Sequence, residues 1–378
     1  MNDLLMPSDV KAGDPADPSR ALGVADSQIP KLPPPPEPAS VKLIVRLFLI
    51  PLLIAGAVIG IMVPFGWLTG GQKSIDVALA DLRRPGGQRT GGWLVGPGAK
   101  QRYIDAKTIV DYLREGKLDD AARTKLADQI IDILDQHTSS DEGEVQAVLL
   151  LALGQVWMRP RDRAHPDQFL PEQDSSQSLV SRKRVLDTLL KYADDKAVST
   201  RKPAILALAY WKGRDEAQAA IPLLIKKLES DSEVDVRISA ATALAQITPP
   251  DNAAAIDALG RAMRDSDPHN AELVWNAAIA LAQLNRPEAK DVVLRLLDRK
   301  ELDSLQYYDR ETDAKNPTMQ PLGDLEKERF LINAMLAAKN YSDPDIQAAI
   351  KKLATSDPSE RVKQAAMEIL EKQKRAAK

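Results

Sequence analysis

Cysteine is absent from this chain of 378 residues, and histidine occurs only three times. The lack of cysteine excludes disulfides and thiolate metal sites, and three histidines offer few ligands for a metal centre. Aromatic residues make up 4% of the chain against an apolar total of 44%, so aliphatic side chains and alanine must form most of the core. That balance favours helices. The net charge is only -3, from 51 basic and 54 acidic residues, so no overall field attracts nucleic acid or an anionic surface.

Large apolar residues are also scarce in residues 1–40, which contain the proline run Pro33 to Pro36. Such a segment cannot bury enough surface to offset its ordering entropy, so we expect a disordered, proline-rich tail. The next segment, 41–68, contains 22 residues without a charge from Leu47 to Leu68. A helix of that length covers ~33 Å, enough to cross the hydrocarbon core of a bilayer. The sequence therefore predicts one transmembrane helix and a single-pass membrane location.

The ends and the middle of this predicted span have features of their own. Arg46 and Trp67 lie at its two rims, where they would act as interfacial anchors. Gly56 and Gly60 form a GxxxG pair, which allows a second helix to approach closely and would support a homodimer. The alternative is that glycine is simply common in membrane helices. Basic residues flank both ends of the span, so the positive-inside rule assigns no side to the rest of the chain.

A connector rich in glycine and proline, residues 69–102, separates the span from a helical region at 103–378. Within that region one pattern recurs in six predicted helices. Stepping from Val236 by four, three, one and three residues gives Ala240, Ala243, Leu244 and Ile247, all on one helix face. The template, anchored on its leucine, fits at Leu153, Leu206, Leu244, Leu281, Leu336 and Leu370, although the copy at Leu336 is polar at both ends.

Each of these helices follows another apolar-periodic segment, so each unit is a helical hairpin. The preceding segments are 121–135, 179–193, 217–228, 253–263, 287–297 and 345–354. One amphipathic hairpin cannot bury its apolar face alone, so successive hairpins must stack on one another. The sequence therefore predicts an all-α fold: an α-solenoid of about six hairpins, preceded by the membrane helix and the tail.

The third unit, AIPLLIKKLESDSEVDVRISAATALAQI, resembles a HEAT repeat, with a proline in its first helix and Asp235-Val236-Arg237 opening its second. The resemblance extends over about residues 121–373 and implies an α-solenoid scaffold rather than an activity. In the family a basic residue at the position of Arg237 commonly links neighbouring repeats, and here Lys363 is the one other basic residue at that position.

Two of the spacings between anchor leucines, 53 and 55 residues, exceed the others and indicate insertions. The first insertion, 159–178, joins a second helix to the next hairpin, whereas the second, 300–323, lies between the two helices of one hairpin. Connections of these two kinds emerge on opposite edges of a solenoid. We therefore expect the insertions to face different directions and not to form one site.

The insertions also contain the best candidates for contacts with a protein partner. Arg159, Arg161 and Arg163 belong to a basic cluster in the first insertion, although interleaved acidic residues make a solvated loop an alternative. The second insertion contains the segment Tyr307-Tyr308-Asp309. Tyrosine gives a large contact area at low entropic cost, so this segment is a candidate contact; the alternative is that both rings pack back onto the solenoid.

No residue set predicts catalysis, a cofactor or a bound metal. The HEAT-like enzyme deoxyhypusine hydroxylase binds iron through His-Glu dipeptides, but here the three histidines precede Thr138, Pro166 and Asn270. We expect a non-enzymatic scaffold that holds a protein partner at a membrane and does not bind nucleic acid. The alternative function is a membrane-tethered enzyme or enzyme subunit whose site is formed by the inserted loops.

Overall fold

The computed structural model describes residues 74–84, 88–90, 93–95, 98–115, 118–136, 142–161, 168–171, 175–309 and 318–376. Within these residues no helix is both long enough and apolar enough to cross a membrane. The predicted tail (1–40) and membrane helix (41–68), with Arg46, Gly56, Gly60 and Trp67, lie outside the described residues. The predictions made for them stay predictions.

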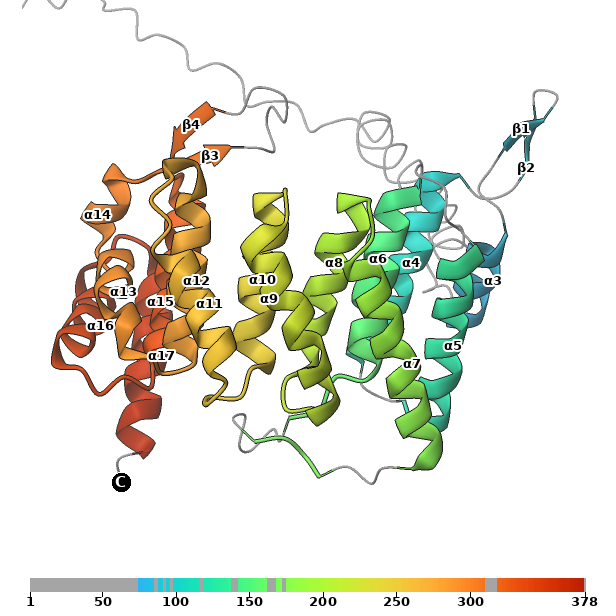
Figure 1. The fold of residues 1–378 in the computed structure, drawn as a ribbon, viewed down its shortest axis with the longest axis horizontal. Coiled ribbons are helices and arrows are strands. Elements are labelled where there is room, and N and C mark those ends of the chain that lie inside the picture. Colours follow the sequence, from blue (N-terminus) through green and yellow to red (C-terminus); the bar gives the residue numbers. More distant parts are fainter. Residues whose placement is uncertain are drawn as a thin grey trace, which may run out of the picture. The chain divides into compact units, whose positions relative to one another are not determined.

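The described residues form pairs of antiparallel helices that follow one another in a row (Figure 1). The first helices of the pairs are α3 (Ile75–Arg83), α5 (Asp120–Gln136), α7 (Ser176–Ala193), α9 (Ile221–Ser230), α11 (Ala253–Met263), α13 (Lys290–Leu296) and α16 (Pro344–Ser356). The second helices are α4 (Ala99–Arg114), α6 (Gly143–Val156), α8 (Val198–Leu208), α10 (Val234–Ile247), α12 (Ala271–Gln283), α15 (Asp324–Ala338) and α17 (Glu360–Ala376).

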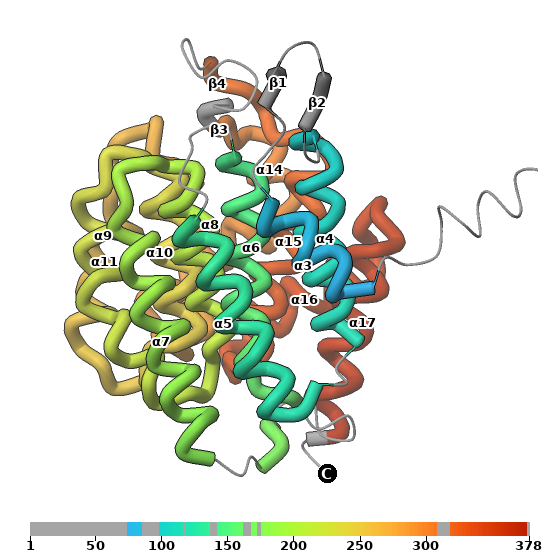
Figure 2. Tube along the Cα trace, turned by 90° about the vertical axis from the view of Figure 1, so that its right-hand side faces the viewer, coloured from blue at the N-terminus to red at the C-terminus, as the bar shows by residue number. Residues whose placement is uncertain are grey.

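Short elements complete the connections between these helices. They are the 3-10 turns η3 (Ala209–Trp211), η4 (Asp215–Ala220), η5 (Pro268–Asn270) and η6 (Pro287–Ala289), helix α14 (Arg299–Ser304), and the strands β1 (Gln88–Thr90), β2 (Trp93–Val95), β3 (Gln306–Asp309) and β4 (Thr318–Pro321). Figure 2 shows the same helices in the view along the row. Each second helix packs on the second helix of the next pair, so one continuous core runs from Leu79 to Ile369. The predicted solenoid of helical hairpins is therefore confirmed.

The buried face of the second helices follows the predicted template in four of the six copies. In α6, α10 and α12 all five template positions are buried, and in α17 the first three apolar positions are. In α8 and α15 the predicted register is wrong by one residue. Ile205 and Met335 are fully buried, whereas Leu206 is half-buried and Leu336 is 49% exposed. Burial depends on which position faces the neighbouring helix, and isoleucine and methionine fill that position as well as leucine does.

The N-terminal part of the described chain differs from the prediction. The connector 69–102 was expected to lack regular structure, yet it contains α3, β1, β2 and the start of α4. Ala78, Leu79 and Leu82 form one buried face of α3 against α4. Because α3 spans only nine residues beside a stretch rich in glycine and proline, its short apolar pattern was masked in the sequence. With α3 and α4, the described residues form seven helical pairs instead of about six.

Two small antiparallel hairpins, β1–β2 and β3–β4, are also additions to the predicted all-α fold. In β1–β2, Thr90 pairs with Trp93, and the sequence between them is Gly91-Gly92, a composition that two-residue hairpin turns favour. In β3–β4, Tyr307 pairs with Gln320 and Tyr308 with Met319. The second insertion thus leaves the solenoid as a β-ribbon, which contains the aromatic residues that favour strands.

Four arginine–carboxylate pairs link one helical pair to the turn of the next, and we call them the inter-repeat pairs. Their closest N–O distances are 2.9 Å for Arg102–Glu142, 2.9 Å for Arg201–Asp231, 3.6 Å for Arg237–Asp265 and 2.9 Å for Arg299–Asp357. Lys363, the other basic residue at the position of Arg237, pairs with Glu360 within its own helix. Arginines at other template positions reach the equivalent turns. The arginine–carboxylate contact therefore recurs between repeats, although the arginine does not recur at one position of the sequence template.

Two helical glycines predict opposite effects of the same substitution. A Cβ at Gly154 would lie 2.6 Å from the carbonyl oxygen and 2.7 Å from the Cβ of Ala207 in α8. A Cβ at Gly260 would meet first the flexible end of Arg264, at 3.3 Å. Both variants gain the higher helix propensity of alanine, but only Gly154→Ala must separate two helices. We expect urea unfolding to give Gly260→Ala ~0.5–1 kcal/mol more stability and Gly154→Ala ~1–2 kcal/mol less. Stabilisation by both changes would contradict the close approach of α6 and α8.

Candidate functional site

The first insertion folds back onto the solenoid through two of its predicted contact residues. The backbone N–H of Leu170 donates to the carbonyl of Pro160 at 2.9 Å, and Arg161 pairs with Phe169, so the two described ends of the insertion lie side by side. The guanidinium groups of Arg159 and Arg161 stack on the Phe169 ring, at 4.8 and 5.4 Å from its centroid. Such contacts hold an aromatic ring in place at a surface. Arg163 lies outside the described residues.

Phe169 in turn covers Gly213, in the connection between η3 and η4. Gly213 has φ +77°, and a Cβ there would lie 2.5 Å from the Phe169 ring, so glycine is required both by the backbone conformation and by the ring. Arg159 Nη1 donates to the Gly213 carbonyl at 2.8 Å. The insertion is therefore fastened to the solenoid edge at which second helices end and first helices begin.

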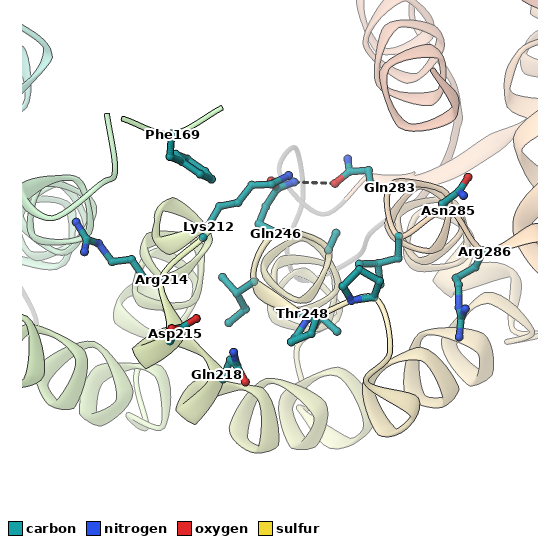
Figure 3. Close-up of a pocket in the computed structure, with 16 residues that line it drawn as sticks. Phe169, Lys212, Arg214, Asp215, Gln218, Gln246, Thr248, Gln283, Asn285 and Arg286 are labelled. Carbon is teal, nitrogen blue, oxygen red and sulfur yellow. Dashed lines mark hydrogen bonds between the residues drawn. The ribbon is translucent and has the colours of Figure 1, made fainter. Parts of the chain in front are cut away.

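A groove of about 650 Å³ opens beside this contact (Figure 3). We call it the edge groove. It follows the C-terminal ends of three consecutive second helices, and its lining includes Phe169, Lys212, Gln246, Thr248, Gln283 and Arg286, with Ala245, Ile247, Pro249, Pro250 and Leu284 as apolar surface. A volume of this size holds a short stretch of peptide or a small molecule.

A row of polar side chains crosses the edge groove from one repeat to the next. Lys212 Nζ donates to Gln246 Oε1 at 3.3 Å, and Gln246 Nε2 donates to Gln283 Oε1 at 2.7 Å. Figure 3 shows the second of these bonds between the two amides. Each carboxamide has two donor hydrogens and an acceptor oxygen, as a peptide backbone alternates donors and acceptors. The row therefore presents groups suited to an extended polypeptide.

Positive charge predominates around the edge groove. Lys212, Arg214 and Arg286 line it, against one carboxylate, Asp215. Arg214 is 6% exposed, and its Nε donates to the Trp157 carbonyl, so its charge is fixed in the wall. A second hollow of about 510 Å³ shares Phe169, Lys212 and Gln246 with the groove and adds Arg159 and Arg161. An acidic ligand would find the complementary charge there.

The far wall of the edge groove is fixed by a turn and a buried tyrosine. Asn285 has φ +56°, a left-handed conformation that asparagine tolerates better than most residues. The Tyr341 hydroxyl donates to the Arg286 carbonyl, and burial raises the pKa of Tyr341 to about 12. The phenol therefore stays protonated, and able to donate this hydrogen bond, throughout the physiological range.

The second insertion lies on the other edge of the solenoid. Strand β3 packs against α12 and η5, the turn that joins α11 to α12, whereas the edge groove lies at the opposite ends of the second helices. In Figure 1, β3 and β4 stand at the top of the row and the described ends of the first insertion lie below it. The predicted separation of the two insertions is confirmed. Tyr307 is half-buried against the core, and the side chains of Tyr308 and Asp309 lie outside the described part.

The described residues hold no group of three or more histidine, aspartate or glutamate side chains that could bind a metal ion. His137 and His165 are not among the described residues. His269 is exposed, and its Nδ1 lies 2.7 Å from Asp267 Oδ1. Hydrogen bonds from the backbone N–H and the ring of His269 lower the pKa of Asp267. This pair closes a turn before α12.

Sequence reasoning named the two arginines but missed Phe169, Gln246 and Gln283. A signal for the glutamines was present: Gln246 and Gln283 each follow an anchor leucine by two residues, as Gln155 does after Leu153. A polar residue repeated at one template position faces the same way in every unit. Phe169 had no such signal, because its partner Gly213 is 44 positions away in the chain. Trp157, Trp211 and Trp275 are buried in the core.

Part of the chain matches a known protein family. Residues 221–307 match the family model for HEAT repeats. No curated protein sequence matches the chain. Among solved structures, an engineered protein aligns at 19% identity and a TM-score of 0.35, over 79% of this chain and 96% of its own.

Two further solved structures align with the chain. A designed armadillo repeat protein aligns at 19% identity and a TM-score of 0.34, over 66% of this chain and 98% of its own. Human deoxyhypusine hydroxylase aligns at 14% identity and a TM-score of 0.27, over 82% of this chain and 98% of its own. At these scores neither alignment supports a functional argument. The described part of the chain is an α-helical repeat solenoid, and its central residues, 221–307, match HEAT repeats.

Proposed function

We propose that this protein is a non-enzymatic, membrane-anchored scaffold that holds an acidic, extended segment of a protein partner in the edge groove. The observation that supports the proposal most directly is the polar row from Lys212 through Gln246 to Gln283, which crosses consecutive repeats beside an apolar surface. Solenoids commonly bind extended ligands along such repeated surfaces. Basic residues around the row favour carboxylates on the partner.

The membrane part of the proposal rests on the uncharged run from Leu47 to Leu68. A span there would attach the solenoid to the bilayer near α3 and concentrate the partner at the membrane surface. Gly56 and Gly60 would allow two such helices to associate. If Gly56→Leu and Gly60→Leu leave self-association of the isolated span unchanged, the proposed dimer through this glycine pair is contradicted.

The alternative, a tethered enzyme or enzyme subunit that uses the insertions, predicts a different surface. It would need acid–base or metal-binding side chains brought together beside a cavity. The edge groove contains Asp215 as its one carboxylate and no histidine. Binding without turnover is therefore the better match to this lining.

The test is capture of partners by the full chain from detergent-solubilised membranes, comparing two charge-reversal variants. Lys212→Glu with Arg286→Glu alters the edge groove, and Lys226→Glu with Lys351→Glu makes the same change of charge on exposed positions of α9 and α16. We expect the groove variant to lose recovery of the partner at least tenfold, the effect of ~1.4 kcal/mol, and the control to retain it. Equal recovery by both variants would exclude the groove as the contact.

A third variant tests the second insertion as the contact. Deleting 300–323 would remove the buried residues Leu302 and Leu322, so a surface change is preferable. Met319 is 37% exposed on β4, and Gln320 is exposed beside it. Under the proposed function, Met319→Ala with Gln320→Ala leaves recovery unchanged. Loss of the partner in this variant alone would move the contact to the β3–β4 ribbon.

A further inference from the structure

The first helical pair exposes apolar and basic side chains together at the N-terminal end of the solenoid. Val77, Tyr103 and Ile104 are 47%, 41% and 44% exposed. Lys100 and Lys107 are exposed on α4, and Arg84 is exposed directly after α3, where its Nη1 lies 3.3 Å from Asp81 Oδ1. We call these six residues the end face. Acidic residues are present as well, since Asp76 and Glu115 are exposed, but they do not separate the apolar residues from the cations in the sequence of α4.

This composition is unusual for the end of a solenoid, because terminal units normally present a polar outer surface to water. The other end of the row follows that rule. On α17 the one large apolar residue that is exposed is Met367, among exposed glutamate, glutamine, lysine and arginine side chains. The two ends therefore differ in the kind of surface that they offer, and the N-terminal one has the chemistry of a segment that rests in a membrane interface.

The end face is fixed to the solenoid by a buried arginine. Arg102 is 1% exposed, and its Nη1 donates to the carbonyls of Leu82 and Arg84 at the C-terminal end of α3, at 3.0 and 2.5 Å. Its Nε lies 2.9 Å from Glu142 Oε1 at the start of α6. Because one side chain joins α3, α4 and α6, any surface that holds the end face also holds the helices stacked behind it.

Chain length places the end face close to the proposed membrane span. Six residues, 69–74, separate Leu68 from Ile75, the first residue of α3. A fully extended stretch of that length covers at most ~20 Å. A span at 47–68 would therefore keep α3 within that distance of its end.

We propose that the end face lies against the lipid surface, with Val77, Tyr103 and Ile104 among the headgroups and the cations on anionic phosphates. This inference rests on the proposed function, because it requires the anchor. Each lysine or arginine near an anionic surface strengthens attachment about fivefold.

The absence of cysteine makes a direct test simple, because one introduced cysteine gives one labelled site. The full chain, as Ile104→Cys or as Met367→Cys, is labelled with a fluorophore and reconstituted into phosphatidylcholine vesicles with or without phosphatidylglycerol and with a headgroup nitroxide quencher. The two positions are matched, at 44% and 47% exposure. We expect several-fold stronger quenching at position 104, and weaker quenching there when Lys100→Glu and Lys107→Glu are added.

Two results would overturn the inference, and they have different meanings. If the chain floats with vesicles after an alkaline wash but the two labels are quenched equally, the end face does not touch lipid and the anchor stands. If the chain does not float, the anchor fails, and with it both the membrane part of the proposed function and this inference. Quenching at position 104 that is unaffected by phosphatidylglycerol and by the two charge reversals would refute the role of the cations.

Discussion

Asp231→Ala is expected to lower the free energy of unfolding by ~3–5 kcal/mol, which is large for a substitution at a turn. Asp231 closes the turn between α9 and α10, and its carboxylate meets Arg201 of the preceding repeat at 2.9 Å. The two side chains are only 4% and 8% exposed. Lys227 also reaches the carboxylate, at 3.4 Å. Without Asp231, the largely buried Arg201 loses its carboxylate partner and keeps its desolvation cost, whereas Lys227 retains Asp194 at 2.7 Å.

An exposed arginine–aspartate pair gives the control. Arg184 and Asp128 also join neighbouring repeats, but their side chains are 49% and 39% exposed. Solvent screens such pairs, so Asp128→Ala should cost less than ~1 kcal/mol. Urea unfolding in detergent solution, followed by circular dichroism, measures both. Equal losses of unfolding free energy in Asp231→Ala and Asp128→Ala would mean that burial of the inter-repeat pair does not increase its contribution to stability.

The same carboxylate predicts how stability depends on pH. Burial disfavours the ionised form of Asp231, but hydrogen bonds from the Glu233 N–H, Arg201 and Lys227 outweigh burial and lower its pKa. A carboxylate with a lowered folded-state pKa contributes stability that is complete above its ordinary value and is lost as the pH falls through the folded-state value. The difference in stability between the wild type and Asp231→Ala should therefore shrink in acid and reach its full size near neutral pH.

How much of this architecture the sequence predicts depends on the range of the interaction. The helices of the third and fourth predicted units follow from a local period, and α11 begins and ends at the residues expected from it, Ala253 and Met263. The same period misplaced the anchors of α8 and α15, because the side that is buried there is selected by the neighbouring helix. A leucine at the wrong face, such as Leu336, is not distinguishable from a core leucine within its own helix.

The candidate site was predictable only in outline, for a related reason. The insertions are visible as breaks in the repeat spacing, and their placement on opposite edges follows from which helices they join. The edge groove is not visible, because its lining comes from connections at positions 212–215, 246–250 and 283–286 together with Phe169. Only stacking of the repeats brings these segments together. The inter-repeat pairs were missed for the same reason, since Arg102 and Arg299 occupy other positions than Arg237 in their units.

Trp211→Ala should be similarly severe, with a loss of ~3–5 kcal/mol, the usual cost of removing a fully buried aromatic side chain. Trp211 is 0% exposed in η3, directly after α8, and its indole N–H donates to the Gly154 carbonyl of α6 at 3.2 Å. The indole thus fills the space between two repeats at the point where α6 and α8 approach most closely around Gly154. Tyr210, the preceding residue, is half-buried, so Tyr210→Ala is the matched control and should cost less.

Trp211→Phe separates packing from hydrogen bonding at this site. Phenylalanine keeps most of the ring but cannot donate to Gly154, so we expect a loss of ~1–2 kcal/mol. The two variants also test whether the edge groove depends on this contact, because Trp211 directly precedes Lys212 and Gly213 in its wall. If the indole positions that wall, Trp211→Ala should fail to capture the partner even at a low temperature at which the variant remains folded. Trp211→Phe should still capture it. Retention by both variants would mean that the fastening of Phe169 and Arg159 to Gly213 is sufficient to hold the groove open.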